Sequence, residues 1–164
     1  GGKIFAFDIH EHRVKLIRNG AKRLGITNIS AETGNAAVYN EKMPMADKIL
    51  CDVPCSGLGV IRRKPEIKYK NYEEFERLPE IQYRILETAA SYLKKGGELV
   101  YSTCTVNPAE NGQVIDRFLN EHRNFEGITF LEELGKPFGE YKVTLFPENF
   151  NSDGFFISKI KRTE

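Results

Sequence analysis

The feature that most constrains this chain is the stretch 48–59, KILCDVPCSGLG, where an apolar run ends in polar chemistry. Lys48–Val53 is too short for a helix and is closed by Pro54, so it predicts a buried strand. Asp52 falls at the end of that strand, and Cys55 follows with two glycines that let backbone approach a ligand. Ligands of open α/β sheets bind beyond the carboxyl ends of the strands, so we expect a binding crevice here.

A second predicted strand, Glu98–Thr105, also ends in a thiol, that of Cys104. Parallel neighbouring strands lie roughly 4.8 Å apart and end at the same edge of a sheet. If the two strands pair in this way, Cys55 and Cys104 face one crevice and Asp52 lies beside them.

The composition is that of one soluble domain, 1–164, with 40% hydrophobic and 29% charged residues among 164. No apolar run approaches the roughly 20 residues of a membrane helix, and no signal peptide opens the sequence. The net charge of +1 is too small for nucleic-acid binding by bulk electrostatics. Three cysteines without paired spacing indicate neither a disulfide framework nor a zinc site, which favours a reducing cytoplasm and no metal.

Strand and helix signals alternate along the chain, which predicts an α/β fold with a mostly parallel sheet and helices on both faces. Further strands are expected at Lys3–Ile9, Asn28–Ala31, Phe125–Leu131, around Val143 and at Gly154–Ile160. Helices are expected at Glu11–Leu24, at Glu73–Lys94 with a kink at Pro79, and from Asn107 to about His122. In the last of these, Asn107 can cap the helix and Glu110 has capping-box spacing.

Two polar residues near the start of the chain have two interpretations each. Asp8 ends a predicted strand, where an acid either binds ribose hydroxyls or caps the following helix. Asn35 lies in a Gly-Asn-Ala turn, where it either faces a ligand or serves the turn, and taken alone it favours the turn.

A basic segment, 60–72, follows the central stretch and interleaves aromatic residues with Arg62, Arg63 and Lys64. Basic and aromatic side chains beside a crevice suit the phosphates and unstacked bases of RNA. A charge run alone is more often a solvated loop, and its position beside Cys55 is what favours RNA binding.

The thiols allow three interpretations. Both cysteines can be structural, as buried Cys51 is expected to be, although each of the other two lies just past an apolar run. A cysteine phosphatase loop is disfavoured because Cys55 and Arg62 are spaced one residue too far apart. The third is addition to a pyrimidine, in which a thiolate attacks carbon 6 of cytosine and makes carbon 5 nucleophilic toward a methyl donor. A carboxyl group and a second thiol would assist that chemistry.

On these residues the chain resembles the RNA cytosine-5 methyltransferases of the NOL1/NOP2/Sun family, in its bacterial ribosomal small subunit methyltransferase B branch. The matching motifs are Asp52–Gly59, Ser102–Thr105, Arg62–Tyr69, Asn107–Asn111 and Asp153–Phe156. The resemblance implies a class I S-adenosylmethionine-dependent, Rossmann-like fold and methylation of a cytosine in 16S ribosomal RNA.

The resemblance also implies a role for each residue of the site. Cys104 would attack the base, Cys55 would assist release, and Asp52 would contact the cytosine edge near the cofactor methyl group. Asp8 would hold the ribose of S-adenosylmethionine, and Asn35, where the family usually has Asp, would lie near the adenine.

The family's first cofactor strand and its glycine-rich turn should precede Asp8, and Gly1-Gly2-Lys3 only imitates them. We therefore expect a catalytic-domain fragment truncated at its amino-terminal side, without that strand, that loop and an amino-terminal RNA-binding domain. Two alternatives remain: a DNA cytosine-5 methyltransferase, which uses the Pro-Cys thiol as nucleophile, and a non-catalytic RNA-binding or scaffold fragment.

Overall fold

The structure is a computed structural model that describes residues 1–135 and 138–164, with Tyr72 described by its backbone only. It divides into two compact units, Gly1–Tyr39 and Asn40–Glu164, which we describe separately. Compact units can be parts of one domain, so the single-domain expectation stays a prediction. No helix of the described residues is long and apolar enough to cross a membrane.

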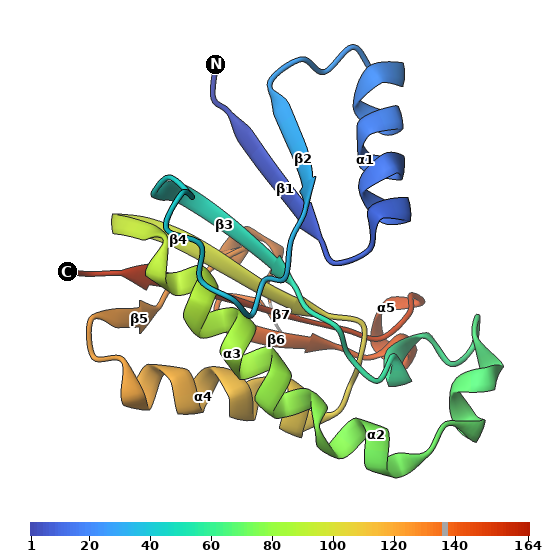
Figure 1. Ribbon diagram of the computed structural model, residues 1–164. Coiled ribbons are helices and arrows are strands. Elements are labelled where there is room, and N and C mark those ends of the chain that lie inside the picture. Colours follow the sequence, from blue (N-terminus) through green and yellow to red (C-terminus); the bar gives the residue numbers. More distant parts are fainter. Residues whose placement is uncertain (136–137) are drawn as a thin grey trace. The chain divides into compact units, whose positions relative to one another are not determined.

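The first unit is a β-α-β element (Figure 1). Strands β1 (Ile4–Asp8) and β2 (Ile29–Thr33) pair in parallel. Helix α1 (Glu11–Arg23) connects them, and its Val14 is fully buried. The helix ends before Gly25, whose φ of +68° is a conformation that glycine adopts without strain. The predicted strands and helix of this region are therefore confirmed to within about two residues.

The second unit contains a five-stranded sheet in the order β3-β4-β7-β5, with β6 also pairing with β7. Its strands are β3 (Ala46–Asp52), β4 (Leu93–Thr103), β5 (Phe125–Gly127), β6 (Lys142–Leu145) and β7 (Phe155–Arg162). Strands β3 and β4 are parallel, whereas β7 runs antiparallel to β4, β5 and β6.

The α/β class is confirmed, but the carboxy-terminal strands differ from the mostly parallel sheet that was predicted. The segment 146–154 between β6 and β7 is too short for a parallel crossover, which needs a dozen or more residues. It contains only the short helix α5 (Pro147–Phe150) and a left-handed Asn151. The chain therefore returns antiparallel.

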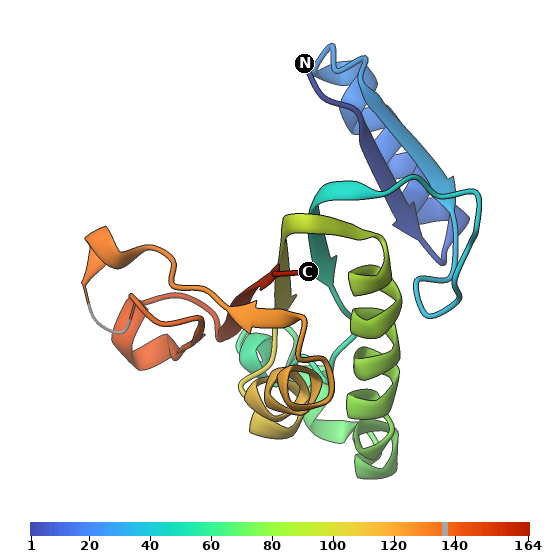
Figure 2. The ribbon, with the colours of Figure 1, turned by 90° about the vertical axis from the view of Figure 1, so that its left-hand side faces the viewer.

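Two helices pack on one face of this sheet, as Figures 1 and 2 show. They are α3 (Leu78–Ser91) and α4 (Gly112–Glu121), whose apolar residues meet Leu99, Tyr101 and Ile160 of the strands. Cys51 lies in this core, as predicted. Helices on both faces of a continuous sheet remain a prediction, because the units are described separately.

The interruption predicted at Pro79 within the helix Glu73–Lys94 is confirmed, although it is a full break rather than a kink. The helix is divided into α2 (Tyr72–Glu76) and α3 because Pro79 cannot continue a preceding helix but fits the first turn of a new one. It also ends at Ser91 rather than near Lys94, since β4 already begins at Leu93. An irregularity in the β3–β4 pairing accommodates the extra residues before Glu98.

Candidate active site

The ends of β3 and β4 form the candidate site. Asp52 is opposite Ser102 in the parallel register, and the Ser102 hydroxyl donates a hydrogen bond to Asp52 Oδ1 over 3.3 Å. The chain then leaves the sheet on both strands, with Cys55 and Cys104 just beyond. The predicted pairing of these two strands is confirmed.

The Sγ atoms of Cys55 and Cys104 are 3.2 Å apart, within hydrogen-bond reach of one another. Both residues are half-buried. The hydrogen bond from Cys55 lowers the pKa of Cys104 to about 7, although burial opposes the shift. The same hydrogen bond, together with burial, raises the pKa of Cys55. Of the two thiols, Cys104 is therefore the one that loses its proton more readily, with Cys55 remaining the hydrogen-bond donor.

Two charged side chains shift the pKa of Cys104 in opposite directions. The negative charge of Asp52 raises the pKa of Cys104, and the positive charge of Lys64 lowers it. A thiolate that forms near neutral pH is the reactive form of cysteine, whereas an ordinary thiol has a pKa near about 8.5. Cys104 is thus the more reactive of the two sulfurs.

Gly59 joins the two cysteine loops by backbone contact. Its N–H donates to the Cys104 carbonyl over 3.0 Å, and its carbonyl accepts the Gly154 N–H over 2.8 Å. A Cβ on Gly59 would lie 2.1 Å from the Gly154 oxygen and 2.8 Å from that of Cys104. The predicted close backbone approach exists at Gly59, but the partner is another segment of the chain rather than a ligand.

A buried network of hydrogen bonds holds the loops that contain Cys55 and Cys104. Glu110, which has no exposed surface, accepts hydrogen bonds from the Ser56 N–H over 2.8 Å and from Gln82 Nε2 over 3.0 Å. The Ser56 and Thr105 hydroxyls, each directly after a cysteine, are 2.8 Å apart.

The sequence did not reveal this role of Glu110, because its spacing fits a capping box. Asn107 does cap, accepting the Ala109 N–H, but its own N–H donates to Thr105 Oγ1 rather than to Glu110. One signal was present: Glu110, Val114 and Phe118 are four residues apart, and helical spacing of this kind aligns the acid, in the 3-10 turn Pro108–Glu110 before α4, with the buried residues of that helix.

The basic residues of the predicted RNA-binding loop are only partly available. Arg63 Nε is 2.7 Å from Asp153 Oδ2, and Arg62 Nη2 is 3.6 Å from Asp153 Oδ1. Asp153 is 4% exposed, so these two guanidinium groups neutralise a buried carboxylate while remaining largely exposed themselves. Lys64 is exposed and contributes its charge toward Cys104.

The two residues predicted to bind cofactor lie in the first unit. Asp8 Oδ1 accepts the His10 N–H over 2.8 Å, and Asp8 Oδ2 is 3.5 Å from Arg13 Nη1. Asp8 therefore stabilises the start of α1. Asn35 Oδ1 accepts the Ala37 N–H over 3.0 Å, which is the turn geometry expected of it. Neither contact uses up the acceptors of these side chains.

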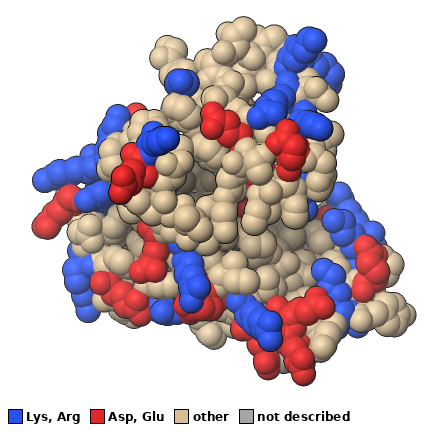
Figure 3. Space-filling view, viewed as in Figure 1, with Lys and Arg blue, Asp and Glu red and all other residues tan. Residues whose placement is uncertain are grey.

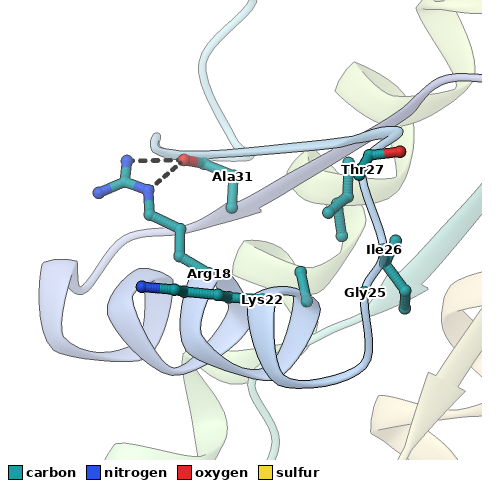
Figure 4. A pocket seen from close by; sticks show the side chains of 8 residues that line it. Arg18, Lys22, Gly25, Ile26, Thr27 and Ala31 are labelled. Carbon is teal, nitrogen blue, oxygen red and sulfur yellow. Dashed lines mark hydrogen bonds between the residues drawn. The ribbon is translucent and has the colours of Figure 1, made fainter.

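A shallow pocket of about 390 Å³ in the same unit contains neither of these residues. It lies between α1 and β2, where Arg18 donates two hydrogen bonds to the Ala31 carbonyl (Figure 4). Over the face of the molecule in Figure 3, basic and acidic side chains alternate without a large patch of one sign, in agreement with the net charge of +1.

Comparisons with known proteins identify the family. The family model of the 16S rRNA methyltransferases RsmB/F matches residues 1–161. A probable ribosomal RNA small subunit methyltransferase B of Bacillus subtilis (strain 168) is 46% identical over 98% of this chain and 38% of its own length. The chain thus spans well under half of that relative.

Solved structures agree. NSun6 from Pyrococcus horikoshii with SFG is 28% identical, with a TM-score of 0.86 over 99% of this chain and 42% of that one. A methyltransferase homologue from Pyrococcus horikoshii is 33% identical, with a TM-score of 0.77 over 98% and 53% of the two chains. The likeness confirms the predicted class I methyltransferase fold. The chain belongs to the 16S rRNA methyltransferase RsmB/F family.

Proposed function

We propose that the protein containing this chain methylates carbon 5 of a cytosine in 16S ribosomal RNA, using S-adenosylmethionine and a covalent adduct with Cys104. The observation that carries the proposal is the sulfur pair, whose Sγ atoms are 3.2 Å apart and in which the hydrogen bond lowers the pKa of Cys104 to about 7. The family membership and the methyltransferase fold support the methyl transfer and the ribosomal substrate. A cytoplasmic location follows from that substrate.

Carbon 5 of cytosine is too weakly nucleophilic to be methylated unaided. The Cys104 thiolate adds to carbon 6, forming a sulfur–carbon bond and shifting an electron pair toward carbon 5 and the ring. Asp52, exposed at the end of β3, takes part as a protonated carboxyl group, which donates a hydrogen bond to the ring nitrogen on which negative charge develops. After transfer, carbon 5 loses its proton, the sulfur–carbon bond breaks, and Cys104 leaves as a thiolate.

Cys55 is suited to the release step because it is the protonated member of the pair. Its raised pKa keeps a proton beside the departing Cys104 sulfur, where it stabilises the thiolate by hydrogen bonding. Because Cys55 already carries a proton, the carbon-5 proton leaves to solvent water. We assign to Cys55 the assistance of product release rather than attack.

The first unit contains polar side chains that can bind the methyl donor, S-adenosylmethionine. A carboxylate at the end of a parallel strand, as Asp8 is, can accept hydrogen bonds from two ribose hydroxyls. The Asn35 amide, exposed in its turn, can serve an adenine edge. S-adenosylmethionine supplies an electrophilic methyl group when bound, so the task of Cys104, Cys55 and Asp52 is to activate the cytosine and release the product.

The test is to incubate the intact protein with methyl-labelled S-adenosylmethionine and small-subunit ribosomal RNA, and to identify the labelled nucleoside by mass spectrometry. The proposal predicts label in 5-methylcytidine, with a matched cytosine-containing DNA duplex unlabelled. Label in another nucleoside would contradict it, label in DNA would favour the DNA-type alternative, and RNA binding without label would favour a scaffold.

A further inference from the structure

Cys55 is held from both sides by two buried side chains. Gln82 Nε2 donates to the Pro54 carbonyl over 2.8 Å, and Glu110 Oε2 accepts the Ser56 N–H over 2.8 Å. Gln82 and Glu110 are also hydrogen bonded to each other over 3.0 Å. The peptide groups before and after Cys55 are therefore fixed to one rigid pair.

The two residues that flank Cys104 are held by a single amide. Thr103 Oγ1 donates to Asn111 Oδ1 over 2.6 Å, and Asn111 Nδ2 donates to the Thr105 carbonyl over 2.9 Å. The hydroxyls of Thr105 and Ser56 then connect the two loops. Both clamps originate in one short turn, since Glu110 and Asn111 are adjacent.

Burying Glu110 costs free energy of folding, and this cost is explained if Glu110 fixes the position of the cysteine loops. A carboxylate without exposed surface is unfavourable unless every acceptor is used, and an apolar side chain would pack there without that cost. Glu110 satisfies the requirement by accepting from Ser56, Gln82 and Asn107 Nδ2, the last over 3.0 Å. Hydrogen bonds of this kind impose direction, which apolar packing does not.

We propose that Glu110 and Asn111 are positioning residues that hold Cys55 and Cys104 in the register at which one sulfur donates to the other. The inference rests on the proposed function for the role of Cys104 as the attacking group, and it extends that function to the residues behind it. Glu110 and Asn111 are buried, so neither offers surface to the base.

If the clamp on Cys55 loosens, Cys104 loses the thiol that stabilises its thiolate. The pKa of Cys104 then returns from about 7 toward the ordinary thiol value. With that value near about 8.5, the thiolate fraction at pH 7 falls by up to roughly fifteenfold. A purely structural role would change the melting temperature and leave this fraction unaltered.

Glu110→Gln in the intact protein tests this directly. The amide is isosteric, but one of its ends becomes a donor and faces either Asn107 Nδ2 or the donors Ser56 and Gln82. We expect the midpoint of iodoacetamide alkylation of Cys104 against pH, followed by peptide mass spectrometry, to rise and the rate at pH 7 to fall severalfold. An unchanged midpoint in the folded variant would overturn the proposal.

Thr105→Val serves if Glu110→Gln does not fold, because it keeps the shape and removes the hydroxyl that joins the loops. It should raise the same midpoint, and an unchanged midpoint would equally overturn the proposal. Ser158→Ala is the control, since it removes a buried hydroxyl that binds the Tyr141 carbonyl, away from the cysteine loops.

Alkylation needs neither RNA nor methyl donor, so it separates the two hypotheses. If the wild-type protein forms no 5-methylcytidine while the two variants still show the raised midpoint, the proposed function is refuted and the positioning role is retained. If the wild-type protein methylates normally and the midpoint is unshifted in Glu110→Gln and Thr105→Val, the proposed function is retained and the positioning role is refuted.

Discussion

Cys55 and Cys104 are 49 positions apart in the chain, and their sulfur atoms lie 3.2 Å apart. The parallel register of β3 and β4 brings them together, because it aligns Asp52 with Ser102 at the ends of both strands. Once the loops converge, one thiol stabilises the other as a thiolate. The asymmetry between two chemically identical side chains is the basis of the functional assignment.

Lys64 should contribute to that asymmetry in the absence of RNA. Lys64→Gln removes a positive charge that lowers the pKa of Cys104, so the pKa should rise and fewer molecules should carry the thiolate at pH 7. The measurement is the pH midpoint of Cys104 alkylation. Lys95→Gln is the matched control, because Lys95 is exposed near the other end of β4. Equal midpoints in both variants would show that the charge of Lys64 does not affect the pKa of Cys104.

Asp52 should separate thiol reactivity from methylation. Its negative charge raises the pKa of Cys104, so Asp52→Asn should lower the pKa and leave alkylation at pH 7 equal or faster. Methylation should nevertheless fall by about 10²–10³-fold, the range for losing one group that stabilises developing charge. Parallel loss of alkylation and methylation would indicate that Asp52 acts only on the sulfur.

The basic loop should bind RNA unevenly. Lys64→Ala should reduce the salt slope of RNA binding by about one unit, as expected for a phosphate contact, without lowering the melting temperature. Arg63→Ala should also destabilise the fold by about 1–3 kcal/mol, because it leaves the buried Asp153 carboxylate poorly paired. Filter binding over a salt series and thermal unfolding check both. An unchanged slope in Lys64→Ala would make the loop a solvated one.

Gly59 should tolerate no side chain. In Gly59→Ala the new Cβ would meet the backbone oxygens of Gly154 and Cys104, which cannot move without breaking both loops. We expect a loss of at least about 2 kcal/mol in the free energy of unfolding, measured in urea. Gly20→Ala in α1, where the Cβ meets no atom within 4 Å, should instead stabilise by about 0.5–1 kcal/mol. Similar losses in both variants would contradict the account.

The sequence predicted those parts of the molecule whose signals are local. Apolar runs closed by polar residues located β3 and β4, and their carboxyl ends indicated where Asp52, Cys55 and Cys104 would gather. The antiparallel return of β7 was not predictable, because strand direction depends on the length of a connection whose boundaries the pattern did not define.

The supporting contacts of the site escaped prediction for another reason. Glu110 binds Ser56 across 54 positions and Gln82 across 28, and Asp153 meets Arg63 from a distant segment. The residues next to each member of such a pair in the sequence do not indicate which distant residue it contacts. Each therefore had a sufficient local explanation, a capping box for Glu110 and a solvated loop for Arg63.

The most direct test of the central claim is to trap the RNA–protein adduct on a denaturing gel with two variants of the intact protein. Cys104→Ala should form no adduct and no 5-methylcytidine, because nothing adds to carbon 6. Cys55→Ala should form adduct more slowly at pH 7, because Cys104 loses the hydrogen bond that lowers its pKa, but should still accumulate it, because release fails. Adduct accumulating in Cys104→Ala and absent from Cys55→Ala would contradict the account and make Cys55 the nucleophile.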